Sequence, residues 1–300
     1  MPTDLERSIL RTVAYFSLFE YPLTMFETWK WLAEPSVAYK LEDVRSALQT
    51  STWLAARLEQ HDGFVMQKGK GDMVATRHTR FLDASRKFHR LHRIGRYLAC
   101  LPMVRAVAAC NTLAWNNTKP ESDIDLFIVT VPGTLWLTRL LTVAPFALLG
   151  MRPKANAHDP VCFSFFASSD AMAMRGLCLD ARDLYLGQWT RSLVPVIDRG
   201  DFSRVAEGNG WVERLFPNSY AVKTATPRRV SFRQTRASRL LRLFESFPRL
   251  MQKSRLPKEI QAMANRDTRV IVNDRMLKFH PNDRRREFMD RLAKLETSLV

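Results

Sequence analysis

Two aspartates in residues 122–130, which read SDIDLFIVT, are the side chains of this sequence best suited to do chemistry. The residues that follow them are strongly β-forming, and side chains alternate between the two faces of a strand. Asp123 and Asp125 should therefore point to the same side, roughly 6.6 Å apart at about 3.3 Å per residue. That separation suits two divalent cations roughly 3.5–4 Å apart, which promote in-line phosphoryl or nucleotidyl transfer. The alternative is an aspartate cap at a strand end, without a chemical role.

The strand that carries these aspartates should lie inside a sheet that is covered on both sides. Ile124, Leu126 and Ile128 would occupy one face, and Phe127 and Val129 would follow the aspartates on the other. A strand that is apolar on both faces is typical of a sheet buried between two layers. Because a carboxylate is costly to bury alone, two acids at the mouth of such a strand need a charged partner.

The residues upstream supply the elements that would position the acidic strand. Residues 103–109 (MVRAVAA) form a short apolar run that predicts the preceding strand. A tight turn at residues 110–112, a short helical piece at 113–115 and a polar loop at 116–121 follow it. This order of strand, turn, short helix, loop and acidic strand resembles the nucleotidyltransferase superfamily that includes DNA polymerase β and the small bacterial nucleotidyltransferases.

The resemblance is carried by two short motifs. Members of the superfamily have Gly-Ser at the turn and Asp-x-Asp on the next strand. Here Asn111 and Thr112 stand where Gly-Ser is expected, and residues 123–125 (DID) match the acidic motif. The resemblance covers residues 105–130. It continues more loosely, toward bacterial members with a helical head and a basic tail, through three flanking segments: 19–24 (FEYPLT), 135–141 (LWLTRLL) and 277–281 (LKFHP).

The resemblance implies transfer of a nucleoside monophosphate from an NTP, such as ATP, to a hydroxyl group, with pyrophosphate leaving. It implies that Asp123 and Asp125 bind Mg²⁺ or Mn²⁺. It also implies that Thr112, with the backbone at Asn111, holds the distal phosphates. The further candidates for contact with the nucleotide are Ser122, Arg105 and Arg139. Metals and positive groups would stabilise charge at the transferring phosphorus, where most of the catalytic effect in such reactions arises.

Two departures from the family pattern bear on activity. Thr112 keeps a hydroxyl, and Asn111 tolerates positive φ, but the Asn111 side chain stands where a phosphate would lie. The third carboxylate of the family, its general base, has no counterpart in the strand expected at residues 161–167 (VCFSFFA). Asp159 precedes that strand and Asp170 follows it, and geometry must decide between such candidates. The alternative function is therefore a nucleic-acid-binding module with weakened or lost chemistry.

The composition of the chain points to polyanionic partners. The chain has 300 residues, 46% of them hydrophobic, and a formal net charge of +16. Its length predicts about two domains with a sizeable core. The positive charge favours polyanionic partners, namely nucleotides, RNA or DNA, or an anionic membrane surface, of which we expect the membrane least; the alternative is solubility alone.

Cysteine usage and hydropathy predict a cytoplasmic protein. The four cysteines, Cys100, Cys110, Cys162 and Cys178, form no C-x-x-C pair, which favours a reducing compartment. The N-terminus is polar and predicts no signal peptide. The most apolar stretch, residues 135–151, is shorter than the roughly 20 residues that cross a bilayer, and we expect it to be a core helix. The sequence contains no Walker loop, no G-x-G-x-x-G and no zinc-ligand spacing.

The expected fold class is α+β, with a mixed sheet of nucleotidyltransferase type at its centre. The expected parts are a helical, winged-helix-like head (1–72), a basic linker helix (73–101), an α/β core (102–226) and a basic helical tail (227–300). The expected elements of the head are helices at 4–17, 25–32 and 41–48 and strands at 53–58 and 64–67. A winged helix often reads DNA with its third helix. Here that helix (LEDVRSALQ) has two acids and one arginine, so a protein contact is at least as well supported.

The C-terminal part of the chain is strongly basic. Four arginines, Arg233, Arg236, Arg239 and Arg242, recur at three-residue spacing with apolar residues between them. The pattern predicts a basic amphipathic helix that could grip a nucleic-acid backbone, lie on anionic lipid or form a solvated face. The further expected elements are a helix at 177–189, a strand at 269–272, a turn at 277–283 and a final helix from 284.

Overall fold

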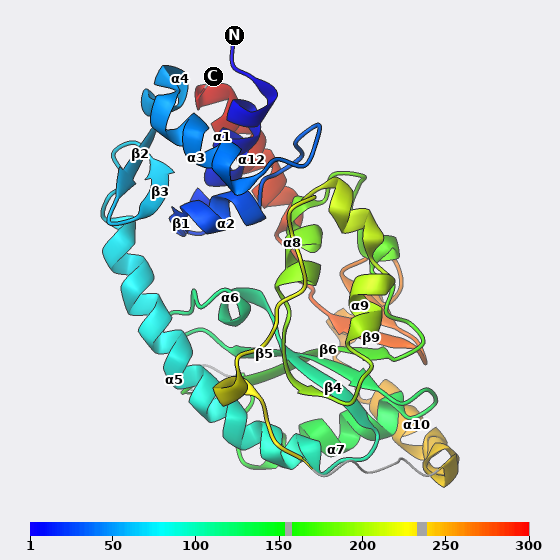
Figure 1. Ribbon diagram of the computed structural model, residues 1–300. Helices are drawn as coiled ribbons and strands as arrows, with labels where there is room; N and C mark the ends of the chain where they lie inside the picture. The colour runs from blue at the N-terminus through cyan, green and yellow to red at the C-terminus, as the bar shows by residue number, and fades with distance from the viewer. Residues whose placement is uncertain (154–157, 233–238, 300) are drawn as a thin grey trace.

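A six-stranded sheet lies at the centre of the computed structural model, which describes residues 1–153, 158–232 and 239–299 (Figure 1). Its strands are β4 (Val104–Ala109), β5 (Ile124–Thr130), β6 (Val161–Ser168), β7 (Val194–Asp198), β8 (Val270–Val272) and β9 (Met276–Phe279). They are ordered β7-β4-β5-β6-β9-β8. The β5–β6 pair is parallel, and the other neighbours are antiparallel. The fold is therefore of the mixed α+β class, as the sequence predicted.

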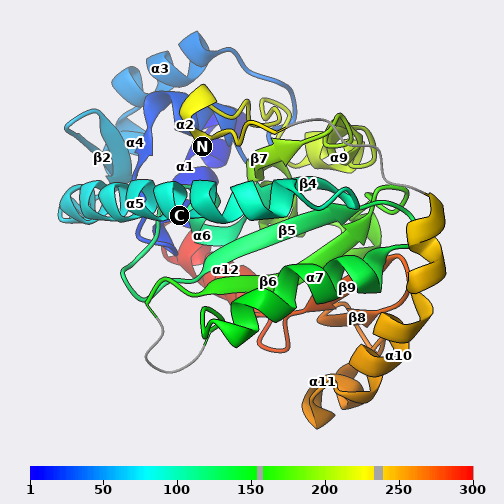
Figure 2. The same ribbon diagram turned by 90° about the horizontal axis from the view of Figure 1, so that it is seen from below.

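Helices cover both faces of this sheet. Helices α5 (Met73–Ala99) and α7 (Leu135–Leu148) lie on one face, which is the face toward the viewer in Figure 2. Helix α8 (Leu184–Ser192) lies on the other face. The core helix expected at residues 135–151 is confirmed as α7, whose Trp136 is fully buried. None of the helices in the described ranges combines the length and the apolar character needed to cross a bilayer.

The acidic strand is buried as predicted. In β5 the side chains from Leu126 to Val129 are fully buried, so both faces of the strand are covered. The neighbouring strand β6 contains a bulge, because Asp125 pairs with Cys162 whereas Phe127 pairs with Phe165. A bulge shifts the alternation of side chains by one residue and often re-aims a side chain next to a functional site. Cys162 and Phe165 are three residues apart, so in a regular strand they would face opposite sides. Because of the bulge, both face the same side of the sheet as Asp125.

The head contains helices and a small sheet. Its elements are α1 (Asp4–Ser17), β1 (Leu23–Thr24), α2 (Met25–Lys30), α3 (Leu41–Thr50), α4 (Thr52–Ala55), β2 (Leu58–His61) and β3 (Phe64–Gln67). The strands form an antiparallel sheet ordered β1-β3-β2. The strand expected at residues 53–58 is wrong for most of that range. Ser51 accepts a hydrogen bond from the backbone N–H of Leu54 and caps α4, so the strand begins only at Leu58.

The remaining helices are short except for the last one. They are α6 (Asn111–Ala114), α9 (Ser203–Glu207), α10 (Ser246–Ser254), α11 (Lys258–Met263) and α12 (Arg285–Leu299). The 3₁₀ helices are η1 (Arg175–Leu177), η2 (Gly210–Arg214), η3 (Thr226–Arg228) and η4 (Arg239–Phe244). The helix expected at 177–189 begins only at α8, because Asp183 caps it by accepting from the backbone N–H of Leu186. Residues 233–238 of the expected basic helix lie outside the described residues.

The C-terminal segment, expected as a basic helical tail, also contributes two strands to the central sheet. Strand β9 occupies part of the segment expected as a turn at 277–283 and pairs with β6, while β8 forms the sheet edge. Helix α12 then returns to the head, where Glu296 pairs with Arg11 of α1 at 2.5 Å. Both ends of the described chain therefore lie together at the head (Figure 1).

Candidate active site

The two aspartates lie beside a cysteine at the beginning of β5. The parallel register places Cys162 of β6 directly opposite Asp125. One ligand atom from each of Asp123, Asp125 and Cys162 lies within 4.8 Å of the other two. In the part of the chain that the structure describes, this is the one such group of acidic, cysteine or histidine side chains. The predicted pairing of the two carboxylates is therefore present, with a thiol as the third group.

Both carboxyl groups are held in an environment that opposes their charge. Burial raises the pKa of Asp125 to about 6, and the neighbouring Asp123 adds to the rise. Hydrogen bonds from Asn111 and Cys162 to Asp125 act in the opposite direction. Burial also raises the pKa of Asp123, against the attraction of Lys87. A cation held between these oxygens would supply the charge partner that burial makes necessary.

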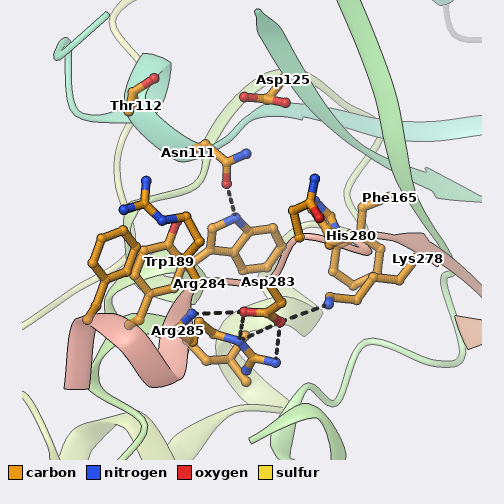
Figure 3. Close-up of a pocket in the computed structure, with 14 residues that line it drawn as sticks. Asn111, Thr112, Asp125, Phe165, Trp189, Lys278, His280, Asp283, Arg284 and Arg285 are labelled. Carbon is orange, nitrogen blue, oxygen red and sulfur yellow. Dashed lines mark hydrogen bonds and ion pairs between the residues drawn. The ribbon is translucent and has the colours of Figure 1, made fainter. Parts of the chain in front are cut away.

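The first two residues of α6, Asn111 and Thr112, lie at the same place as the acidic strand's beginning. Asn111 has a φ of 52°, in the left-handed region that the sequence predicted it would tolerate. Its Oδ1 accepts a hydrogen bond of 3.0 Å from Nε1 of Trp189, so its amide nitrogen is available to Asp125 (Figure 3). Thr112 lines the cavity in front of Asp125. The structure thus brings together four of the predicted site residues: Asn111, Thr112, Asp123 and Asp125.

A buried lysine fixes the loop that leads into the acidic strand. Lys87 of α5 is fully buried, and its Nζ donates to Asp83 at 2.8 Å. The same Nζ donates to the carbonyl oxygens of Lys119 at 2.6 Å and Pro120 at 3.1 Å. Because these carbonyls belong to the loop just before Asp123, the lysine sets where the acidic motif begins.

A cavity of about 330 Å³ opens in front of Asp125 (Figure 3). Two ring pairs form much of its wall. The rings of Phe165 and Trp189 stack with centroids 5.4 Å apart, and those of Tyr185 and Phe288 stack at 5.7 Å. Flat aromatic surfaces of this kind favour a planar ligand group by stacking.

Positive side chains of the C-terminal segment, Lys278, Arg284 and Arg285, also line the cavity (Figure 3). Lys278 is only 6% exposed, and burial lowers its pKa to about 8. Its Nζ lies 3.6 Å from a carboxylate oxygen of Asp283, which also pairs with Arg285 at 2.8 Å. Arg285 in addition contacts the buried Asp183 at 2.7 Å. Arg284, beside them, is exposed and can reach a ligand.

A half-buried histidine, His280, also lines the cavity. Burial lowers the pKa of His280 to about 3. Its Nε2 lies 3.2 Å from the hydroxyl of Ser164. Its Nδ1 is buried without a hydrogen-bond partner among the described residues. A ligand in the adjoining cavity is one way to satisfy that nitrogen.

Sequence reasoning did not assign the cavity residues of the C-terminal segment. Lys278, His280 and the run from Asp283 to Arg285 are far from the acidic motif in sequence and reach it only through the β6–β9 pairing. The available signal was the segment 277–281 (LKFHP), which took part in the family resemblance but was expected to form a turn. Polar side chains alternate there with apolar ones, which is the pattern of a strand with one polar face.

Three predicted nucleotide contacts lie elsewhere. Arg105 is at the opposite end of the sheet, because β4 runs antiparallel to β5 and Val104 pairs with Thr130. There it forms an ion pair with Asp201 and donates to the carbonyl oxygen of Arg199 at 3.1 Å. Ser122 is next to Asp123, but its hydroxyl accepts from the backbone N–H of Lys119 at 3.0 Å and does not line the cavity.

Arg139 is on the other face of the sheet. Its guanidinium lies 5.0 Å from the ring centroid of Phe279, whose neighbours in sequence, Lys278 and His280, line the cavity. It also donates to Gln252 at 2.6 Å. Burial and the nearby Arg152 lower the pKa of Arg139 to about 10. The sequence did not reveal this because it does not specify which face of the sheet α7 covers.

Neither candidate for a third carboxylate belongs to the group. Asp159 is buried and engaged by Arg86 and by Lys87, whose Nζ lies 3.3 Å away. Asp170 follows the far end of β6, where it accepts a hydrogen bond of 2.5 Å from Ser168 and pairs with Arg275 at 3.5 Å. Among the described side chains, the position opposite Asp125 is filled by a thiol.

Three comparisons place these features against known proteins. They covered protein-family models, curated proteins and solved structures. None of the three found a match to this chain.

Proposed function

We propose that this chain is a nucleotidyltransferase that transfers a nucleoside monophosphate from an NTP to a hydroxyl group, with pyrophosphate leaving. The observation that carries the proposal is the position of Asp125. Its carboxylate belongs to a group able to hold a metal ion and also lines a cavity with aromatic and cationic walls. A bound metal and the cationic side chains would stabilise charge at the transferring phosphorus, and the aromatic walls would position the base.

The arrangement of the elements supports a nucleotidyltransferase-type fold. Strand β4, the Asn111–Thr112 turn, the short helix α6 and the acidic strand β5 follow one another as the family resemblance expects. Asp125 lies at the beginning of β5, beside Asn111 and in front of the cavity (Figure 3). In the head, the four helices α1 to α4 precede β2 and β3, and this order of helices before a small sheet supports a winged-helix-like module there.

Each side chain has a role that follows from its position. Asp123 and Asp125 would hold a divalent cation, which when bound neutralises charge on the phosphates. The Asn111 amide is engaged by Trp189 and Asp125, so phosphate contact at the turn falls to Thr112 and to backbone N–H groups. The rings of the cavity would stack on the base.

The cations opposite the acids would face the triphosphate. Arg284 is exposed and lines the cavity, and its ion pair with the exposed Glu287, at 2.6 and 2.7 Å, is one that a bound phosphate would compete with. Lys278 is anchored by Asp283 and by the carbonyl oxygen of Thr268 at 2.7 Å, and would act as a fixed positive charge. Fixed charges of this kind need no reorganisation when negative charge develops.

Metal-dependent nucleotide binding tests the proposal. Calorimetric titration of the full chain with non-hydrolysable analogues of ATP, CTP, GTP and UTP should show binding that requires a divalent cation. Asp123→Asn and Asp125→Asn should weaken it by about tenfold or more, equivalent to at least 1.4 kcal/mol. Asp170→Asn, an acid at the other end of β6, is the matched control and should bind normally.

The outcome that rejects the proposal is equally definite. If the folded protein binds none of the four analogues with Mg²⁺, Mn²⁺ or Zn²⁺ present, the site is not a nucleotide site. Binding that is unchanged in Asp123→Asn and Asp125→Asn would place the nucleotide elsewhere. Release of pyrophosphate from the natural NTPs then separates a transferase from a protein that only binds nucleotides.

A nucleic-acid-binding module is the second candidate function. The observation that favours it is the lack of a third carboxylate beside Asp123 and Asp125 among the described side chains. Against it, several basic side chains of α5 are already held in ion pairs with acids of the same chain: Arg77 with Glu27, Arg80 with Glu20, and Arg86 with Asp159. A binding module should take up RNA or DNA without metal, with an affinity that falls steeply as salt rises.

A further inference from the structure

The group that faces Asp125 from the next strand is a sulfur, and this bears on which cation the site accepts. The parallel register places Cys162 opposite Asp125, and the bulge in β6 begins just after it. The carboxyl groups of Asp123 and Asp125 and the thiol of Cys162 offer two oxygens and one sulfur within 4.8 Å of one another. This donor set differs from the all-oxygen set that the family resemblance implies.

Mg²⁺ and softer cations respond differently to such a set. Mg²⁺ prefers six oxygen ligands and gains little from sulfur. Zn²⁺ binds thiolates and carboxylates together and accepts four ligands, so that three protein donors leave one position open. Donors about 2.0–2.3 Å from a zinc ion lie roughly 3.3–3.8 Å from one another, so the present group needs to contract by about an ångström.

We propose that Asp123, Asp125 and Cys162 bind one thiophilic divalent cation, of which Zn²⁺ is the type, in preference to Mg²⁺. The inference rests on the proposed function for the location of the cation and departs from it in the identity of the cation. The thiol releases its proton to solvent when the sulfur binds. Of the three donors, Asp125 lines the cavity, so a substrate in the cavity would approach a bound cation from the side of Asp125.

The surroundings of the sulfur support this assignment. The hydroxyl of Ser164 hydrogen-bonds to Cys162 and also lies 3.2 Å from Nε2 of His280. Outer hydrogen-bond partners of this kind orient a metal ligand and are a regular part of metal sites. No positively charged side chain among the described residues forms an ion pair with either aspartate, so these oxygens are not already neutralised by an ion pair.

Cobalt spectroscopy on the metal-free full chain tests the sulfur ligand directly. Co²⁺ should produce a near-ultraviolet thiolate-to-cobalt charge-transfer band in the wild type and in Cys100→Ser, whose exposed thiol is the matched control. The band should disappear in Cys162→Ser. Zn²⁺ should abolish it at equimolar concentration, whereas Mg²⁺ should fail to do so even at about a hundredfold excess.

A second variant reverses the preference. Cys162→Asp restores an all-oxygen set, so it should raise Mg²⁺ affinity by about tenfold or more and give no charge-transfer band. X-ray absorption of the zinc-loaded wild type needs no variant and should show one sulfur at about 2.3 Å. A band that persists in Cys162→Ser, or a zinc spectrum without sulfur, overturns the proposal.

The result also separates this inference from the proposed function. If the protein turns over nucleotides with Mg²⁺ but gives no cobalt band, the proposed transferase function is supported and the sulfur ligand is rejected. If the protein gives a cobalt band that depends on Cys162 but binds no nucleotide, the metal site is supported and the transferase function is rejected.

Discussion

Nε1 of Trp189 donates a hydrogen bond of 3.0 Å to Oδ1 of Asn111, which ties α8 to the turn that precedes the acidic strand. The bond determines which end of the Asn111 amide faces Asp125, since the oxygen is occupied by the indole. It therefore links the aromatic wall of the cavity to the carboxylate. In a nucleotide site of the proposed kind, Trp189 would both stack on the base and fix the Asn111 side chain at the turn that faces the phosphates.

Replacement of Trp189 by phenylalanine should separate these two roles. Trp189→Phe keeps an aromatic ring near Phe165 but removes the donor, which should cost about 1 kcal/mol of unfolding free energy. It should also weaken binding of an NTP analogue by about threefold to tenfold, because the Asn111 amide is no longer fixed. Urea denaturation and calorimetric titration measure the two effects.

The chain offers a matched control for this variant. Nε1 of Trp211 donates to Oδ1 of Asn209, also at 3.0 Å, and neither residue lines the cavity. Trp211→Phe should lose similar stability and leave nucleotide binding unchanged. Equal weakening of binding by both variants would mean that Trp189 acts through general stability alone.

The raised pKa of Asp125 predicts how stability depends on pH. Because the folded-state pKa is about 6 against an ordinary value of 3.8, the folded state binds the proton more tightly than the unfolded state. The stability that the folded protein gains from holding this proton is fully present below about pH 4, and it is lost as the pH rises through about 6. Asp125→Asn removes the cost of burying the ionised carboxylate. It should therefore stabilise the metal-free protein by about 2 kcal/mol at pH 8, but hardly at pH 4.

Thermal unfolding of the metal-free variants at both pH values checks this prediction. Asp170→Asn, which alters an acid with no place in the cavity, should show no such pH-dependent gain. Destabilisation of Asp125→Asn at pH 8 would show that the carboxylate is stabilised by its surroundings and not opposed by them.

Removal of the Lys87 ammonium group should strongly destabilise the fold. Lys87→Met keeps most of the side-chain volume but leaves Asp83, Asp159 and two loop carbonyls without their buried partner. Loss of one partner from a buried ion pair costs about 3–5 kcal/mol. Urea denaturation should show this loss, whereas Arg93→Met, at an exposed position of the same helix, should change stability by less than about 0.5 kcal/mol.

The segment that begins at residue 239 is held to the core because one of its side chains, Glu245, caps the N-terminus of α7. Glu245 accepts hydrogen bonds from the backbone N–H groups of Trp136 at 2.7 Å and Leu137 at 2.9 Å, in the first turn of α7. Glu245→Ala should cost about 1–2 kcal/mol, because the helix N-terminus loses both a cap and a favourable charge. The exposed Glu259 of α11 provides a control, and Glu259→Ala should be nearly neutral in the same denaturation experiment.

The sequence by itself determined the features that depend on local periodicity. Alternation along a strand places Asp123 and Asp125 on one side of β5, whatever the rest of the fold does. The left-handed turn at Asn111, the long helix α5 and the core helix α7 also follow from local preferences, and all three are present. These features could be predicted because each depends on residues a few positions apart.

Only the tertiary structure decided which side chains meet the two acids. The register between β5 and β6 brings Cys162 to Asp125, and the β6–β9 pairing brings Lys278 and His280 to the cavity. The antiparallel direction of β4 carries Arg105 away from the site. Strand order, direction and register depend on how the whole sheet buries its apolar faces, so they cannot be predicted from any short stretch of sequence.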